Sequence, residues 1–207
     1  MARSRSAVTG TPPPEGAGRP ARAPRGPRPP RPVRLVRVTA DPGAREGRLT
    51  AGAFSCPVLV GRGGVIHAKR EGDGATPAGM FSLRQVLYRP DREAPPATGL
   101  PVAAIGPDDG WCDDPLDPAY NRAVRHPYGA SAERLWRRDR LYDLIVVVGH
   151  NDAPPVPGDG SAVFIHLASP RRTPTAGCLA LRHDDLLQVL ARLGPATRLE
   201  IIANAVI

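Results

Sequence analysis

Two apolar runs lie close together in the second half of the chain and limit the folds open to it. They are YDLIVVVG, residues 142–149, and SAVFIHLA, residues 161–168. The short segment between them holds three prolines and has no helical period, so it is too small for the crossover that joins parallel strands. We therefore expect the two runs to be antiparallel neighbours in a β-sheet.

Shorter runs separated by turn residues predict further strands. Residues 33–40 alternate apolar and basic side chains, which is typical of a half-buried strand. Arg62-Gly63 between two apolar runs predicts a tight hairpin. Residues 90–130, rich in Pro, Asp and Gly, predict a long, ordered excursion. The other expected strands are 57–61, 64–69, 79–89 and 197–207.

One stretch, residues 183–194, has a firm helical signal. Two acids open it, leucines recur along one stripe, and Gly194-Pro195 stops it. Ser131 with Glu133 predicts a short helix over 131–138 at best. The chain is therefore expected to be mainly β, with one firm helix near the C-terminus.

The first 32 residues differ from the rest in composition. They hold nine of the 26 prolines, and seven arginines against one acid, Glu15, which is a net charge of +6 out of the chain's +8. With so few apolar residues they cannot offset the entropy lost on folding, so we expect a disordered Arg/Pro-rich tail, 1–32, and one domain, 33–207. Because the basic charge lies mostly in the tail and aromatic residues are few, nucleic acid is not the expected partner.

The chain shows neither a membrane span nor a secretory signal. No apolar run approaches the roughly 18 residues of a transmembrane helix, and prolines follow the basic start where an apolar h-region would stand. Taken literally, the chain is cytosolic. Cys56, Cys112 and Cys178 are an odd number at wide spacings, which suits neither a disulfide framework nor a zinc ribbon.

The stretch FIHLASPRRTPTAGCLALRHDDL, residues 164–186, brings a base and a nucleophile close in sequence. His166 ends a predicted strand, and the following loop can return Cys178 to face it. Gly177 permits a sharp turn that would expose its own amide and that of Cys178 as oxyanion donors. The alternative is a core histidine and a buried thiol with no chemical role.

Zinc binding by His150, His166, Cys178 and His183 is a further alternative. If the two apolar runs form one hairpin, His150 and His166 lie roughly 15 Å apart at the usual strand rise. His183 falls at the predicted helix start. We therefore expect no metal site.

The arrangement His-x11-Cys with the order T-x-G-C-L resembles the signature of the L,D-transpeptidase catalytic domain (YkuD-type) family. A second segment, KREGDGATPAGMFSL at 69–83, is similar to the family's Thr-Pro-x-Gly turn and the strand after it. The resemblance implies a β-sandwich or mixed-sheet domain without cofactor, expected to be a monomer. It implies acyl transfer on peptidoglycan stem peptides, cleaved after their diamino-acid residue, for cell-wall cross-linking or remodelling and thus cell shape.

The resemblance also implies site residues and a place of action. Cys178 is the expected nucleophile, His166 its base, and Thr175 and Gly177 the oxyanion or substrate-binding positions. Cell-wall substrates imply the cell envelope or periplasm, although the sequence shows no export signal; the cytoplasm is the alternative. A hydrolase of L,D-carboxypeptidase type using the same pair, and a non-catalytic cell-wall binding module, remain open.

Three positions depart from the family pattern. Leu167 replaces the usual glycine or serine after the histidine, the loop to Thr175 is short, and Ala180 stands where arginine or asparagine often follows the cysteine. These departures indicate a divergent branch with its own donor and acceptor. The segment 106–121 is interpreted either as a wall of a variant substrate groove or as an ordered surface loop around a buried tryptophan.

Overall fold

The computed structural model describes residues 30–204 and is mainly β, as predicted. The expected disordered tail lies outside the described residues, apart from 30–32. The one helix among these described residues is α1, His183–Leu190. The strands are β1 Leu35–Ala40, β2 Glu46–Ala51, β3 Phe54–Leu59, β4 Val65–Ile66, β5 Thr76–Pro77, β6 Gly79–Tyr88, β7 Val102–Ala104, β8 Asp109–Cys112, β9 Ala123–Arg125, β10 Ala132–Arg134, β11 Leu144–Val148, β12 Phe164–Leu167, β13 Leu179–Leu181 and β14 Arg198–Ala203.

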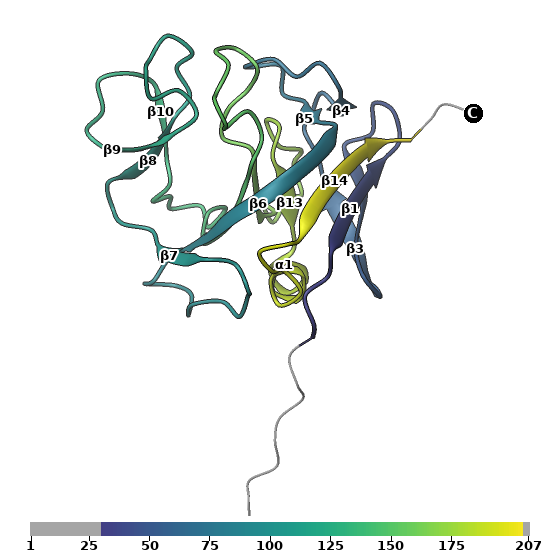
Figure 1. The fold of residues 1–207 in the computed structure, drawn as a ribbon. Coiled ribbons are helices and arrows are strands. Elements are labelled where there is room, and N and C mark those ends of the chain that lie inside the picture. The colour runs from purple at the N-terminus through teal and green to yellow at the C-terminus, as the bar shows by residue number, and fades with distance from the viewer. Residues whose placement is uncertain (1–29, 205–207) are drawn as a thin grey trace, which may run out of the picture.

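The main sheet closes on itself. Its order is β11-β12-β13-β3-β2-β1-β14-β6-β7, and β6 also pairs with β11, which completes the ring. Figure 1 shows the long strand β6 crossing the molecule beside β14 and β1, with α1 at one end of the sheet. The predicted antiparallel neighbours β11 and β12 are confirmed, with Ile145 opposite His166.

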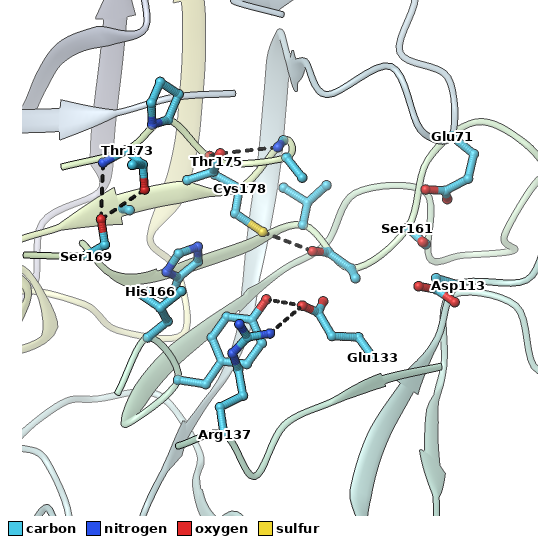
Figure 2. A pocket seen from close by; sticks show the side chains of 18 of the residues that line it. Glu71, Asp113, Glu133, Arg137, Ser161, His166, Ser169, Thr173, Thr175 and Cys178 are labelled. Atoms are coloured by element: carbon cyan, nitrogen blue, oxygen red, sulfur yellow. Dashed lines mark hydrogen bonds and ion pairs between the residues drawn. The ribbon is translucent and has the colours of Figure 1, made fainter. Parts of the chain in front are cut away.

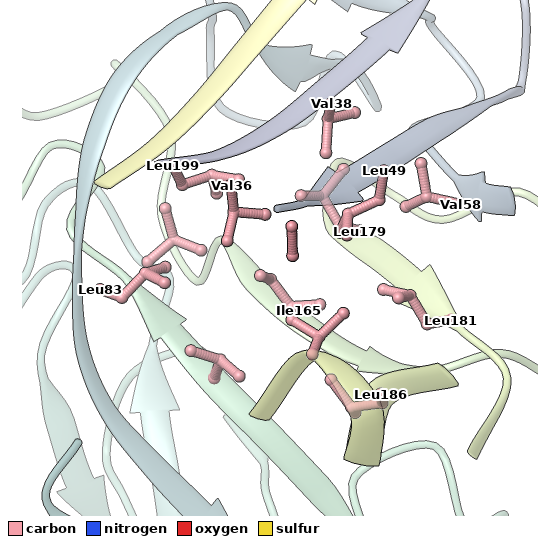
Figure 3. Packing of buried hydrophobic residues seen from close by; sticks show 14 of the residues in the cluster. Val36, Val38, Leu49, Val58, Leu83, Ile165, Leu179, Leu181, Leu186 and Leu199 are labelled. Carbon is pink, nitrogen blue, oxygen red and sulfur yellow. The ribbon is translucent and has the colours of Figure 1, made fainter. Parts of the chain in front are cut away.

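Alternating burial along the strands builds the core inside this sheet. In β1 the side chains of Val36 and Val38 are fully buried, while those of Leu35 and Arg37 are not. Helix α1 contributes Leu186, as its leucine stripe predicted. Figure 3 shows these apolar side chains converging between the strands and the helix. The core fixes the register of β12 and β13, the strands that carry the candidate site.

The predicted hairpin at Arg62-Gly63 is wrong. β4 pairs with β5 and not with β3, while Gly61 bridges to Thr175 and the Arg62 N–H donates to the Thr175 carbonyl at 2.9 Å. The loop before Cys178 thus takes the place of the expected partner strand. The hairpin forms one strand earlier, between β2 and β3, where Gly52 supplies a positive φ of 63°.

The predicted short helix at 131–138 is also wrong. Residues Ala132–Arg134 form β10, which pairs with β8 in a three-stranded sheet of order β10-β8-β9. A weak local helical preference is overridden here by the partner strand and by the burial of Leu135.

The segment 106–121 is anchored to the main sheet by its tryptophan. Trp111 is buried, donates from Nε1 to the Asn121 side chain at 2.9 Å, and packs edge-on against Phe164 at 5.3 Å between ring centroids. Because Phe164 opens β12, this packing places the segment beside the strand that carries His166.

Across residues 30–204, no helix has the length and apolarity to cross a membrane.

Candidate active site

His166 is held in one tautomer by its own strand. The side chain is buried, and its Nδ1 lies 2.9 Å from the Leu167 carbonyl, which can only accept a hydrogen bond. Nδ1 therefore carries the proton, and in the neutral ring Nε2 is the acceptor. The Tyr142 ring packs edge-on against the imidazole at 5.2 Å between centroids. His166 thus presents Nε2 as an acceptor with no partner among residues 30–204.

Cys178 lies directly before β13, next to β12, so its thiol shares a pocket with His166 (Figure 2). The thiol donates to the Ala162 carbonyl at 3.2 Å and accepts from the Phe164 N–H at 3.3 Å. Both bonds go to backbone groups. In residues 30–204 no hydrogen bond joins the thiol to His166 in this state. Transfer of the thiol proton to His166 requires the S–H to turn away from the Ala162 carbonyl, while the Phe164 N–H can still donate to the sulfur.

Two threonine hydroxyls hold the carbonyl of Cys178. Thr175 Oγ1 donates to it at 2.6 Å and Thr76 Oγ1 at 3.4 Å, while Thr76 also accepts from the Gly61 N–H at 2.8 Å. Thr76 belongs to the Thr-Pro-x-Gly segment, so the two similar segments of the sequence meet here. Together the two hydroxyls fix the backbone that carries Cys178.

The predicted oxyanion groups are partly used within this loop. The Gly177 N–H donates to Thr175 Oγ1 at 3.2 Å, and that hydroxyl in turn donates to Cys178. The Cys178 N–H, by contrast, has no acceptor within residues 30–204. Of the donors named from the sequence, the Cys178 amide is therefore the one available to a developing oxyanion.

Gly177 is required by the geometry of the loop. Its φ is 139°, and a Cβ built on it would lie 2.9 Å from the Ala75 carbonyl oxygen. Because that neighbour is backbone, it cannot rotate away. A side chain at this position would therefore move either the Cys178 loop or the Ala75 turn.

We expect Gly177→Ala to destabilise the domain by about 1–3 kcal/mol, the usual cost of such a strained backbone position. Acylation should fall further than stability if Cys178 reacts, because the displaced residue directly precedes Cys178. Urea unfolding and single-turnover acylation on the same preparation measure the two effects. Gly72→Ala is the matched control: Gly72 also has a positive φ of 76°, but nothing lies within 4 Å of its Cβ position. Equal losses of acylation in both variants would contradict the argument from loop displacement.

Charged side chains line much of the pocket, which has a volume of about 470 Å3. Glu133 Oε1 accepts from the Tyr142 hydroxyl at 2.7 Å and from Arg137 at 3.4 Å (Figure 2). Lys69, Glu71 and Asp113 are the other charged lining residues. Asp113 comes from the 106–121 segment, so that segment does line the pocket as well as enclosing Trp111.

The two candidate catalytic groups, the Cys178 thiol and the His166 imidazole, are both neutral at pH 7. Burial, and then the nearby Glu133 carboxylate, raise the pKa of Cys178 to about 12. Burial lowers the pKa of His166 to about 4. The resting site therefore holds a thiol and an imidazole, not a thiolate–imidazolium pair.

This charge state predicts the pH dependence of thiol alkylation. Below its pKa a thiol gains about tenfold in thiolate for each pH unit. We expect the alkylation rate of Cys178 by iodoacetamide, followed by peptide mass mapping, to keep rising from pH 7 to pH 10. A plateau beginning below pH 8 would instead show an ion pair with His166.

The other zinc candidates are engaged elsewhere. His150 Nε2 donates to the Asp159 carbonyl at 2.9 Å, and His183 Nε2 lies 3.0 Å from Glu93. Within the described part of the chain, no three His, Cys, Asp or Glu side chains are grouped to hold a metal ion. The structure thus brings together His166, Cys178, Thr175 and Gly177 and leaves His150 and His183 apart from them.

Sequence reasoning missed three contributors to the site. Thr76 carried a signal, because it lies in the similar segment 69–83. Tyr142 and Glu133 carried none, since the contact between them, and that of Tyr142 with His166, depend on the pairing of β10 with β8 and of β11 with β12.

Comparison with known proteins identifies one family. The sequence model of the L,D-transpeptidase catalytic domain (YkuD) matches residues 36–201. No curated protein matches the chain. A solved structure, that of Bdellovibrio bacteriovorus Bd1075, is similar over 82% of this chain and 48% of that chain, at 14% sequence identity and a TM-score of 0.41. The chain thus spans about half the length of that protein.

Proposed function

The chain belongs to the L,D-transpeptidase catalytic domain family, and from this we propose that it is an acyltransferase that uses Cys178 as nucleophile and His166 as base. The observation that carries the proposal is the pocket shared by the Cys178 thiol and an imidazole whose Nε2 is free to accept a proton. The substrate class that we propose is the peptidoglycan stem peptide, cleaved after its diamino-acid residue.

The neutral pair supports acylation by general-base catalysis. As the sulfur attacks the peptide carbonyl carbon, Nε2 of His166 takes the thiol proton and a C–S bond forms. The Cys178 N–H is positioned by the fixed loop to donate to the resulting oxyanion. When the tetrahedral intermediate collapses, the C–N bond breaks and His166 returns the proton to the leaving amine. A thioester at Cys178 remains.

Transfer to an acceptor reverses these roles. A neutral amine of a second stem peptide attacks the thioester carbonyl, and His166 accepts the proton that the new amide nitrogen loses. The C–S bond then breaks and the sulfur recovers its proton from His166. Water in place of the amine gives the hydrolase outcome with the same residues, so the acceptor decides between transferase and carboxypeptidase.

We further propose that the protein acts in the cell envelope, where such polymers lie. Fractionation of cells that carry a tagged copy at the native locus is the test of this assignment. Recovery of all the protein from the cytosol would contradict it and would move the substrate from polymer to soluble precursor.

The test of the chemistry is capture of the acyl-enzyme. Incubation with a tetrapeptide stem, or with a β-lactam of the carbapenem type, should add one acyl group that peptide mapping locates at Cys178. Addition of an amine acceptor should then yield the cross-linked product in preference to the hydrolysed tripeptide. A protein that binds the peptide but forms no adduct would be a binding module, and the proposal would be wrong.

A further inference from the structure

Lys69 is the one lysine among the chain's 28 basic residues, and its charge is buried in the catalytic pocket. Its side chain is only 6% exposed. A buried ammonium is costly unless it is paired and hydrogen-bonded. All 27 other basic residues of the chain are arginines, so the use of lysine at this buried position needs a physical explanation.

Two of the three ammonium donors have protein partners. Nζ donates to Asp73 Oδ1 at 2.6 Å and to the Arg70 carbonyl at 2.8 Å. Asp73 also accepts from the backbone N–H groups of Arg70 at 2.7 Å and Ala75 at 2.8 Å, so its negative charge is shared among three donors. The third N–H of Lys69 has no acceptor within residues 30–204. Lys69 thus keeps an unused donor and part of its charge.

The methylene chain of Lys69 packs beside the loop that carries Gly177 and Cys178. A Cβ at Gly160 would lie 2.9 Å from Lys69 Cγ and 3.1 Å from Cε, and a Cβ at Gly177 would lie 3.6 Å from Cε. Gly160 therefore leaves the channel through which the side chain reaches the pocket, and Gly177 marks where Cε lies in contact with the loop before Cys178. The wider, planar guanidinium of arginine does not match this channel or the tetrahedral set of donors.

Lys69 makes no hydrogen bond to the thiol: burial raises the pKa of Cys178, and the charge of Lys69 opposes that rise without a direct contact. Both hydrogen bonds of the Cys178 sulfur go to Ala162 and Phe164. The remaining donor of Lys69 is therefore available to a bound ligand. Lys69 Cε would lie 3.6 Å from a Cβ at Gly177, the residue before Cys178, so a ligand group bound by Lys69 would lie near the bond that Cys178 attacks.

We propose that Lys69 is a specificity-determining residue that binds the terminal carboxylate of the donor peptide, on the leaving side of the scissile bond. The other charges of the pocket favour this orientation. Glu71, Asp113 and Glu133 line the same pocket and disfavour a carboxylate near them. Arg137 pairs with two carboxylates, Asp139 at 2.6 Å and Glu133 at 3.4 Å. Lys69 pairs with one, Asp73, which two backbone N–H groups share, so Lys69 is the lining cation with the most charge left for a ligand. This inference rests on the proposed acyl transfer and adds the group by which the donor is recognised.

The test compares two donor peptides that differ only in a terminal carboxylate or carboxamide. The double variant Lys69→Met/Asp73→Asn removes both charges and leaves no uncompensated buried carboxylate. Asp73→Asn alone removes the carboxylate but leaves Lys69 with the Asn oxygen and the Arg70 carbonyl as acceptors, and it is the matched control. The readout is the rate of Cys178 acylation by mass spectrometry, with melting temperatures to confirm that each variant is folded.

We expect the wild type and Asp73→Asn to acylate with the carboxylate donor about 10- to 100-fold faster than with the carboxamide, the range for one charge-assisted hydrogen bond. The double variant should lose this preference because its rate with the carboxylate donor falls. An equal fall with both donors would assign Lys69 a general electrostatic role and overturn the proposal. An unchanged preference would also overturn it. If the wild type acylates with neither donor, the proposed function itself fails, which is a different result.

Discussion

Cys178→Ala is expected to reduce acyl transfer by more than about 10³-fold, because no other group in the site can form the thioester. Stability should change little, since the substitution removes one sulfur atom and two weak hydrogen bonds to backbone groups. The measurements are product formation from tetrapeptide-bearing muropeptides and the melting temperature of the same sample.

Cys56→Ala is the control for this experiment. Cys56 is buried in β3, within the main core and outside the pocket. Its replacement is expected to lower the melting temperature without removing the capacity for acylation. Retained turnover in purified Cys178→Ala would show that the nucleophile has been wrongly assigned.

His166→Asn is expected to lower the rate of acylation by about 10²- to 10⁴-fold, the usual contribution of a positioned base. The Asn side chain can still donate to the Leu167 carbonyl, as Nδ1 does, but it cannot accept the thiol proton. Single-turnover acylation at pH 7 measures the loss. An undiminished rate in a folded variant would exclude His166 as the base.

The pH profile of the wild type gives an independent check on His166. Because the pKa of His166 is lowered to about 4, the imidazole is neutral and able to accept a proton at any pH well above that value. The rate should therefore be lost only as the pH falls through about 4, provided that the domain remains folded. An acid limb near pH 6.5, the ordinary value for histidine, would mean that His166 is solvated during the reaction.

Local patterns predicted those parts of the fold that local forces determine. The apolar runs that became β11 and β12 are fully buried in the sheet, so their composition alone distinguished them from the turns. Helix α1 was predictable because acids in its first turn and a leucine stripe agree with each other. Segments 62–63 and 131–138 were predicted wrongly because distant partners, Thr175 and β8, decide their conformation.

The candidate site divides in the same way. His166 and Cys178 could be predicted as a pair because one loop joins them and because the sequence around them resembles a known family signature. The hydrogen bond from Thr76 to the Cys178 carbonyl joins residues 102 positions apart in the chain. The hydrogen bond from Tyr142 to Glu133 forms only because short strands pair. The sequence contains these residues without any pattern that shows which of them meet.

The parallel pairing of β1 with β14 sets a time at which the domain can be completed. Arg37 and Glu200 meet across these strands although 163 positions separate them. During synthesis β1 can pair with β2 on one side, but its other edge stays open until Arg198–Ala203 has left the ribosome. The neighbouring edge of β6 also stays unpaired until then, because β14 lies between β1 and β6. Such long-range pairing makes folding slow, and chains that stop before β14 expose two unpaired strand edges to their neighbours. Because β1 and β14 lie side by side, we expect prematurely terminated chains of this protein to aggregate through the strand edges left open.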